Sequence, residues 1–397
     1  MPPQGATRIS WRSSPSGQAS GVEARLAEVL RRLQEVYEKV PKHAKDDILG
    51  SMTTQPHPLA LMAYQMFQNF NVNDEVLYSP LRELEEEAVR MMGEFVGCRG
   101  CTGMITTGGT ESNIAALYLA REHGYRRVYA ARTAHHSVAK AARILGLEYV
   151  QVGDRGYRLD VDDLRRRCRS EGPGVVVVTV GTTGVGTIDP VEEASEAASE
   201  CGSVVHVDAA YGGFVAPFAH PDRRLGFENG AVTTLTMDPH KLGLAPLQAG
   251  GLLVRDEEWL RPLRFEANYL PAGSQLGLLG TRSAGPVAAT WAMLSYLGRD
   301  GYRALAMELM RRLSLLEVEV GAAGLRLAAE PEVPIACIEV EDDRSSMKAL
   351  WGRGIYVYTC GVARGVRVVI MPHVTEDKLR RLVSALRELE GARRAGR

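Results

Sequence analysis

Two stretches of the chain, His206-Val-Asp-Ala-Ala-Tyr-Gly-Gly213 and Thr236-Met-Asp-Pro-His-Lys-Leu-Gly-Leu244, carry the most information about its fold and chemistry. In the first, Asp208 ends an apolar run that is typical of a buried β-strand. In the second, Lys241 follows a histidine in a turn bounded by proline and glycine. An unpaired carboxylate in an apolar interior is costly, so Asp208 needs a cationic partner.

Pyridoxal phosphate would satisfy both residues. A lysine in an apolar site can lose its proton and form a Schiff base with an aldehyde. The cofactor's aldehyde would take Lys241, and its protonated ring nitrogen would take Asp208. Taken singly, each residue has an ordinary alternative: a surface charge for the lysine, and a helix cap or structural ion pair for the aspartate.

A third stretch, Thr106-Thr-Gly-Gly-Thr-Glu-Ser-Asn113, ends a polar turn and opens a helical pattern with Ile114, Leu117 and Tyr118 on one face. The free N–H groups and the positive dipole end of such a helix bind anions, which suits a phosphate. The alternative is an ordinary helix start, with Thr110 as the N-cap and Glu111 in the first turn.

Short β-branched runs alternate with helical patterns between about residues 100 and 255, which predicts a mostly parallel sheet with helices on both faces. Ligands of such sheets bind at the carboxyl ends of the strands. Thr183, Asp208 and Lys241 all follow such runs. The runs are Arg127 to Ala131, Tyr149 to Val152, Val175 to Val180, Val204 to Val207, Thr233 to Thr236 and Gly251 to Val254.

Outside this region the periodicity predicts further elements. Amphipathic helices are expected over Val22 to Tyr37 and Pro80 to Gly93, and a long helix over Pro286 to Gly298. A C-terminal α+β segment would contain strands at Ile335 to Glu339 and Val366 to Met371 and a closing helix from Glu376 to Glu390.

The composition indicates an enzyme of the cytoplasm. The 397 residues carry a net charge of −1, so neither nucleic acid nor an anionic membrane is expected as a partner. No apolar run approaches the ~20 residues that span a bilayer, and Met1 to Gly21 lack the apolar core of a signal peptide.

Cys98 and Cys101 form the one close cysteine pair. Without a second pair a metal site is not expected, and free thiols or a local disulfide are favoured.

These motifs, in this order, resemble the pyridoxal-phosphate-dependent group II amino-acid decarboxylases, and among them most closely the archaeal L-tyrosine/L-aspartate decarboxylases. The resemblance runs from about residue 50 to the C-terminus. The matching stretches are Ser51 to Pro58, Gly108 to Asn113, Ala134 to Val138, Val180 to Gly184, His206 to Gly213, Asp238 to Lys241, Ala245-Pro246 with Ala249 to Gly251, and Val368 to Val374.

The resemblance implies an α/β fold of fold type I: a large domain with a mostly parallel sheet flanked by helices, and a smaller C-terminal α+β domain. The expected division is a disordered tail (1–21), an N-terminal helical segment (22–75), a large cofactor-binding domain (76–285) and a small C-terminal domain (286–397).

Family membership would also assign roles to single residues. Lys241 would hold the cofactor covalently, Asp208 its ring nitrogen, and His135 would stack on its ring, with His136 as the alternative. Thr183, or Thr182 in its place, would touch the ring hydroxyl or the substrate carboxylate. The expected cofactor-binding set is Gly109, Thr110, His135, Thr183, Asp208, Ala210, His240 and Lys241.

The substrate would be held by residues from both ends of the chain. Arg367 would grip the α-carboxylate bidentately, unless it is an edge-strand arginine that faces water. His57 and Asn71 lie in the segment that shapes the pocket in the family, as do Thr54 and Asp74. Tyr269, in the loop Phe265 to Thr281, corresponds to the tyrosine that protonates the substrate carbon after CO2 leaves.

The implied reaction is decarboxylation of an L-amino acid, either L-aspartate to β-alanine (a step toward coenzyme A) or L-tyrosine to tyramine. The sequence leaves open which of the two is used. The alternatives are glutamate decarboxylation, or a carbon–carbon lyase acting on a phosphorylated amine, because sphingosine-phosphate lyases share much of this motif set. A homodimer with shared active sites is expected.

Overall fold

The computed structural model describes residues 19–395, and the chain divides into two units, Met1–Asp46 and Asp47–Arg397. The described part of the first unit is dominated by α1 (Ala19–Lys39), in which Val22, Leu26 and Val29 recur at helical spacing. The predicted helix is therefore confirmed, but it begins at Ala19, so residues 19–21 of the predicted disordered tail are helical. Residues 1–18 of that tail lie outside the described residues. No helix within residues 19–395 is long and apolar enough to cross a bilayer.

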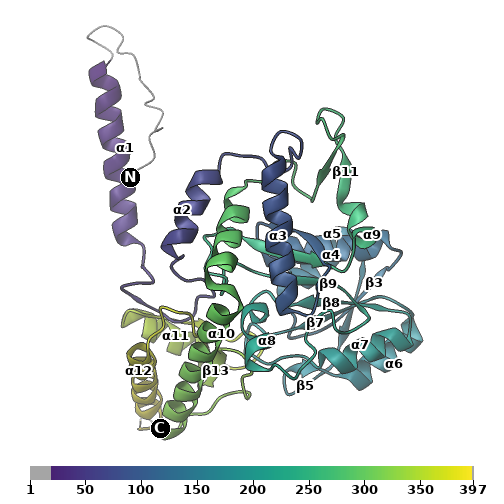
Figure 1. Ribbon diagram of the computed structural model, residues 1–397. Coiled ribbons are helices and arrows are strands. Elements are labelled where there is room, and N and C mark those ends of the chain that lie inside the picture. Colours follow the sequence, from purple (N-terminus) through teal and green to yellow (C-terminus); the bar gives the residue numbers. More distant parts are fainter. Residues whose placement is uncertain (1–18, 396–397) are drawn as a thin grey trace. The chain divides into compact units, whose positions relative to one another are not determined.

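The second unit is built around a seven-stranded sheet with the strand order β2-β10-β9-β8-β7-β3-β4. Figure 1 labels β9, β8, β7 and β3 of this sheet. Neighbouring strands from β9 to β4 run parallel, while β10 is antiparallel to both β2 and β9. The mostly parallel sheet is thus confirmed. The strands are β2 (Thr102–Thr106), β3 (Arg127–Ala131), β4 (Glu148–Val152), β7 (Val175–Thr179), β8 (Val204–Asp208), β9 (Val232–Met237) and β10 (Gly250–Val254).

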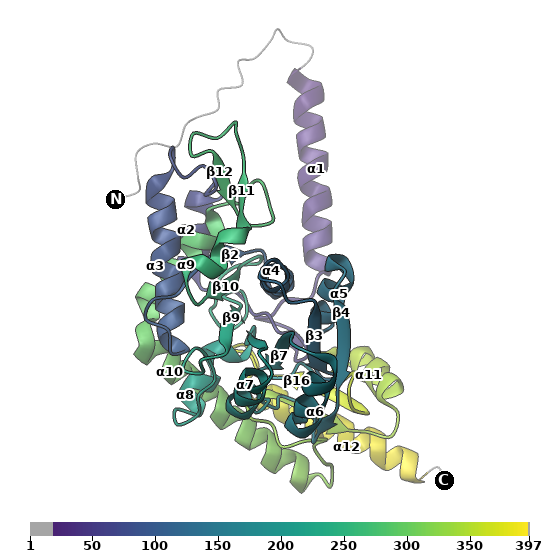
Figure 2. The ribbon, with the colours of Figure 1, turned by 90° about the vertical axis from the view of Figure 1, so that its right-hand side faces the viewer.

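Helices cover both faces of this sheet, which explains its continuous apolar strands (Figure 2). Successive valines of β7 point to opposite faces: Val176 and Val178 join the larger core cluster, and Val175 and Val177 join a smaller one. On the larger side pack α3 (Ser79–Phe95), α6 (Val161–Glu171), α7 (Val191–Glu200) and α8 (Ala216–Ala219); on the smaller side pack α4 (Gly109–Glu122) and α5 (His136–Leu145).

The long helix α10 (Gly285–Ala322) packs against α3 and against α2 (Pro58–Phe67). It begins where the sequence predicts but continues 24 residues past Gly298, the predicted end (322 − 298). Gly298 has φ 55°, so the helix kinks there rather than stops.

The C-terminal part forms a three-stranded antiparallel sheet in the order β13-β16-β15, covered by helices, as predicted. Its elements are β13 (Ile335–Glu339), β15 (Tyr358–Thr359), β16 (Gly365–Val369), α11 (Asp343–Gly352) and α12 (Glu376–Ala395). The remaining short elements are β1 (Asp47–Ile48), β14 (Ile355–Tyr356), β5 (Asp154–Arg155), β6 (Arg158–Leu159), β11 (Arg264–Glu266), β12 (Ser274–Leu276) and α9 (Glu257–Leu260).

Candidate active site

A cavity of about 410 Å³ lies at the carboxyl ends of β7, β8 and β9, beside the N-terminus of α4. This is where a ligand is expected in a parallel sheet, because loops and helix N-termini converge at that edge. All eight residues predicted to bind the cofactor line it. They are Gly109, Thr110, His135, Thr183, Asp208, Ala210, His240 and Lys241.

Asp208 is buried at the end of β8 and is held by neutral hydrogen-bond donors. Asn113 Nδ2 donates to its Oδ2 at 2.9 Å, and the Ala210 N–H donates to its Oδ1 at 3.2 Å. His206, two residues earlier on the same face of β8, lies 3.0 Å from Asn113 Oδ1, and burial lowers the pKa of His206. Within residues 19–395 no ion pair reaches Asp208, so its charge is available to a ligand in the cavity.

The structure separates the two candidate histidines. His135 lines the cavity at the N-cap of α5, whereas His136 is exposed. The Ser137 N–H donates to His135 Nδ1 at 3.4 Å, and Ser137 Oγ lies 2.7 Å from the same nitrogen. Burial lowers the pKa of His135 to about 4, which leaves a neutral imidazole at neutral pH. A neutral ring can stack on an aromatic ligand without adding charge beside Asp208.

An anion cradle is formed by residues 108–110 at the start of α4. Gly108 is the N-cap, has φ 150° and provides no side-chain cap, so the first N–H groups of the helix face the cavity uncapped. The alternative in which Thr110 caps the helix is wrong, because α4 already begins at Gly109. A Cβ on Gly109 would lie 2.8 Å from Asp238 Oδ2, so any larger residue there would displace the carboxylate that contacts Lys241.

Lys241 projects into the cavity from the turn that follows β9. Its Nζ lies 3.1 Å from Asp238 Oδ2, and His240 Nε2 lies 3.6 Å from the same oxygen. The other Asp238 oxygen is buried without a hydrogen-bond partner in the described structure. Asp238 therefore orients both predicted cofactor residues of this turn, a role that the sequence did not reveal.

Thr182 and Thr183 both lie in the turn from Gly181 to Thr187, but their surroundings differ. Thr183 lines the cavity, whereas Thr182 is buried and its Oγ1 lies 2.8 Å from that of Thr187. Arg367 reaches the same turn from β16: its Nη1 donates to the Thr183 carbonyl at 3.4 Å and its Nη2 to the Gly50 carbonyl at 3.0 Å. Because β16 is the central strand of its sheet, Arg367 is not an edge-strand residue.

Four residues of the predicted catalytic and substrate set do not line the cavity within residues 19–395 of one chain, namely Arg367, His57, Asn71 and Tyr269. His57 caps α2, where its Nδ1 accepts from the Leu59 N–H. Asn71 Oδ1 accepts from the Arg282 and Asn73 N–H groups. Tyr269 is 79% exposed in the segment between β11 and β12. Thr54 likewise lies outside the lining, with its Oγ1 2.9 Å from the His373 ring.

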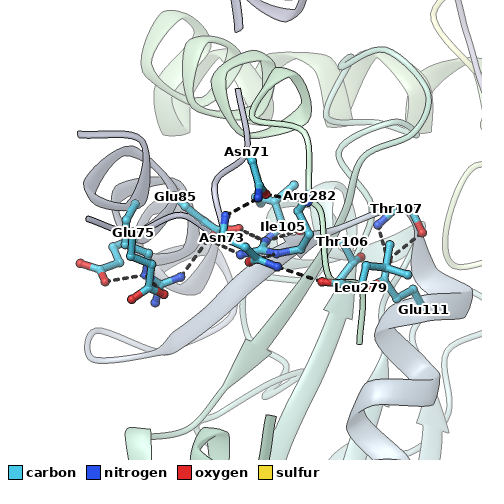
Figure 3. A network of polar contacts seen from close by, with 12 residues as sticks. Asn71, Asn73, Glu75, Glu85, Ile105, Thr106, Thr107, Glu111, Leu279 and Arg282 are labelled. Atoms are coloured by element: carbon cyan, nitrogen blue, oxygen red, sulfur yellow. Dashed lines mark hydrogen bonds and ion pairs between the residues drawn. The ribbon is translucent and has the colours of Figure 1, made fainter. Parts of the chain in front are cut away.

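A buried polar network beside the cradle fixes the strand that leads into it (Figure 3). Glu85 is fully buried and receives two hydrogen bonds from the Arg282 guanidinium, at 2.6 and 3.1 Å. The Ile105 N–H donates to the same carboxylate, and its carbonyl accepts from Arg282. Arg282 Nε also donates to Asn73 Oδ1. The network thus joins β2, α3 and the segment between β12 and α10, which contains Arg282.

Removing Arg282 is expected to destabilise the protein strongly. Arg282→Ala leaves Glu85 in the core with one guanidinium partner fewer, and breaking a buried pair from one side costs about 3–5 kcal/mol. Chemical denaturation of the cofactor-free protein measures this loss. The exposed Arg303 on α10 is the control, because Arg303→Ala should change the free energy of unfolding by no more than about 0.5 kcal/mol. Equal losses for both variants would contradict the assigned role of the network.

The donor set fits pyridoxal phosphate. Asp208 supplies a buried, unneutralised carboxylate for a ring nitrogen, and residues 108–110 supply uncapped N–H groups for a phosphate. Lys241 supplies the amine and His135 a neutral ring at the cavity wall. These features lie around one cavity.

Sequence reasoning missed three residues that shape this site, namely Asn113, His206 and Asp238. A signal existed for His206, because it shares a strand face with Asp208 and polar side chains on one face of a buried strand must contact each other or a ligand. Asn113 lay within a quoted motif, but its partner Asp208 is 95 positions away (208 − 113). Asp238 stood in the same quoted stretch as its partners His240 and Lys241, so a local signal existed for it.

Comparison with known proteins gives a consistent result. Residues 69–340 match the family model described as "Pyridoxal-dependent decarboxylase conserved domain". A "Probable L-tyrosine/L-aspartate decarboxylase" from Methanothrix thermoacetophila is 38% identical over 356 residues, covering 88% of this chain and 93% of the relative. A "Probable L-aspartate decarboxylase" from Archaeoglobus fulgidus is 34% identical over 346 residues, covering 86% and 94%.

Solved structures share the fold. A sphingosine-1-phosphate lyase from Burkholderia pseudomallei superposes with a TM-score of 0.82 at 24% identity, covering 98% of this chain and 94% of the other. A glutamate decarboxylase from Lactobacillus brevis gives 0.77 at 19% identity, covering 92% and 91%. At these identities the likeness concerns the fold alone.

Proposed function

The chain belongs to the pyridoxal-dependent decarboxylase family, and we propose that it removes the α-carboxylate of L-aspartate or L-tyrosine. It is a pyridoxal-phosphate-dependent amino-acid decarboxylase. The observation that carries the assignment is the convergence of Asp208, Lys241, His135 and the α4 cradle on one cavity. The two substrates are supported by the names of the relatives, which span nearly the whole chain.

Pyridoxal phosphate, when bound, accepts the electron pair released as a bond to the substrate α-carbon breaks. We assign to Asp208 the task of keeping the ring nitrogen protonated, with Asn113 holding its carboxylate in place. His135 would support the ring as a neutral imidazole. The Lys241 amine would hold the cofactor before the substrate amine replaces it and could then carry protons at the α-carbon.

Arg367 is the proposed holder of the substrate carboxylate. It is half-buried, and burial lowers its pKa. Within the described residues its hydrogen-bond partners are two backbone carbonyls, its guanidinium lies over the Tyr358 ring at 5.6 Å, and its Nε is buried without a hydrogen-bond partner. A half-buried guanidinium with spare donors beside a cavity can take a carboxylate ligand. The orientation it imposes would select the bond that breaks.

A homodimer with shared active sites is the proposed assembly. Leu247 lines the main cavity and is 59% exposed. Leu279 is also exposed and lines a smaller cavity that shares Thr107, Glu111 and Gln248 with the main one. Exposed apolar side chains at the mouth of a site suit a covering partner, and we propose that Tyr269 acts in the partner's cavity.

Subunit mixing tests this arrangement. Lys241→Ala and Tyr269→Phe chains should each be nearly inactive alone. If Tyr269 acts in the neighbouring site, a mixed dimer contains one site with both residues intact, so random pairing should restore about one quarter of wild-type activity. No recovery in mixed dimers, verified by differently sized tags, would place Tyr269 in its own chain's site or remove it from catalysis.

A CO2-release screen of the twenty amino acids with the cofactor-loaded enzyme decides the substrate. Release from L-aspartate or L-tyrosine is expected, and Tyr269→Phe should lower kcat about 100-fold, the size of a general acid's contribution. Release from L-glutamate alone would replace L-aspartate and L-tyrosine by L-glutamate as the assigned substrate. Release from none, with an aldehyde formed from a phosphorylated amine, would replace the decarboxylase assignment by carbon–carbon cleavage. Cytoplasmic location and a place in coenzyme A synthesis stay predictions, the latter tied to β-alanine as the product.

A further inference from the structure

All six cysteines of the chain form disulfides, and one of these lies beside Arg367. Cys98–Cys101 joins neighbours in the sequence, and Cys168–Cys201 joins the ends of α6 and α7. Neither pair lines the main cavity. The third, Cys337–Cys360, belongs to the small sheet that carries Arg367.

The strand register places this disulfide on the same face as Arg367. Cys337 on β13 pairs directly with Arg367 on β16, and Glu339 pairs with Gly365. Cys360 follows β15 and donates its N–H to the Gly365 carbonyl. Paired residues of an antiparallel sheet point to one face. The disulfide therefore crosses the central strand, linking the residues on either side of β16.

Gly365 makes this crossing possible. A Cβ at position 365 would lie 2.5 Å from Cys337 Sγ, inside the contact distance of the two atoms. The central strand thus lacks a side chain at the position over which the disulfide passes. Cys337 and Cys360 are both buried, together with Val185 from the turn that carries Thr183.

The same turn connects the disulfide to the active site. A Cβ on Gly184 would lie 2.5 Å from the Cys360 carbonyl oxygen, so the backbones of the two segments are in close contact. Arg367 donates to the Thr183 carbonyl one residue earlier. Within residues 19–395 no carboxylate side chain pairs with Arg367, so its position depends on β16, on this turn, on the Gly50 carbonyl and on the Tyr358 ring of β15.

We propose that the Cys337–Cys360 disulfide is a covalent brace that positions Arg367 for the substrate carboxylate, so that the oxidised enzyme binds substrate more tightly than the reduced enzyme. The brace ties both neighbours of β16 together and holds the Cys360 backbone against Gly184. Reduction would let the loop after β15 move away from the turn. The proposal rests on the proposed role of Arg367.

The bond forms by oxidation of two thiols. With a small-molecule disulfide as oxidant, the two cysteines exchange in two steps. One disulfide is formed in the protein, and the two electrons and two protons pass to the two released small thiols. A dithiol reductant reverses the exchange. Loss of the brace should act mainly on the substrate carboxylate, because Thr183 is the one predicted cofactor residue in the turn from Gly181 to Thr187, whereas Asp208, Lys241 and the α4 cradle belong to the large sheet and its helices.

The test compares Cys337→Ala/Cys360→Ala with the matched pair Cys168→Ala/Cys201→Ala in the cofactor-loaded enzyme. Thiol titration and peptide mass spectrometry of the unreduced wild type should first show no free thiol and the Cys337–Cys360 cross-link. The first double variant is expected to raise KM about tenfold, with kcat and the cofactor dissociation constant changed less than twofold. A dithiol reductant should raise the KM of the wild type and of the control pair to the same degree.

Three outcomes would overturn the brace: free thiols at 337 and 360, an unchanged KM in the first variant, or an equal KM change in the control pair. Arg367→Lys, measured in parallel, keeps the two proposals apart. A raised KM in Arg367→Lys with an unchanged KM in the cysteine variant rejects the brace alone. An unchanged KM in Arg367→Lys rejects the carboxylate-holding role, and with it the brace as stated.

Discussion

Lys241→Ala is expected to lower kcat for amino-acid decarboxylation by about 10⁴-fold or more, because one residue both attaches the cofactor and moves protons at the substrate carbon. The Lys241 amine is held at the cavity wall by Asp238, 3.1 Å away. The variant should still bind the cofactor through contacts with residues 108–110 and Asp208, but without a covalent link.

Borohydride reduction followed by denaturation separates covalent attachment from simple binding. In the wild type the cofactor should remain on the peptide that contains Lys241, whereas Lys241→Ala should release it. Lys140→Ala, an exposed lysine of α5, is the matched control and should behave as wild type. Retention of the cofactor on Lys241→Ala would show that another amine forms the link and would remove Lys241 from its assigned role.

Asp208→Asn is expected to lower kcat about 10³-fold, the scale for losing a preorganised charge in a water-excluded site. The asparagine keeps the size of the side chain and a hydrogen bond to Asn113, but not the negative charge that favours a protonated ring nitrogen. Cofactor affinity should also fall, and equilibrium dialysis with quantified cofactor measures it separately from turnover.

Asp208→Glu and Asp162→Asn complete this experiment. The glutamate retains the charge and should recover part of kcat, which a purely structural role for Asp208 would not predict. Asp162 is exposed on α6, so neutralising it should leave both kcat and cofactor affinity unchanged. If Asp208→Asn keeps wild-type kcat, the ring nitrogen has another partner and the assignment of Asp208 is wrong.

Local sequence was sufficient for the large sheet and its ligand edge. The runs that become β3, β7 and β8 are apolar and β-branched, since both faces of these strands are buried. Asp208 and Lys241 then lie at the same edge of the sheet. Each crossover connection brings the chain back to the opposite edge before the next parallel strand begins, so the carboxyl ends of the parallel strands lie together. The N-terminus of α4 could likewise be predicted, because glycine is unfavourable in the interior of a helix and the glycines here therefore mark its start.

Long-range contacts decided the rest. The sequence alone did not show that β10 inserts antiparallel between β2 and β9, or that Gly298 kinks a helix instead of ending it. Asn71 was predicted to shape the substrate pocket, yet its Oδ1 accepts from Arg282, 211 positions away. A polar side chain near a turn has many potential partners, and only the packed chain determines which of them lies within hydrogen-bond distance.

The fold class, the edge of the sheet proposed to bind the cofactor and the residue types proposed to hold it could all be predicted from the sequence alone. These follow from periodicity and from residue type, which are local properties. The folded chain was needed to show that His135 and Thr183, and not His136 and Thr182, line the cavity, and which cysteines pair. Those choices depend on which side chains face a shared cavity or cross a neighbouring strand, and such distances exist only once the chain is packed.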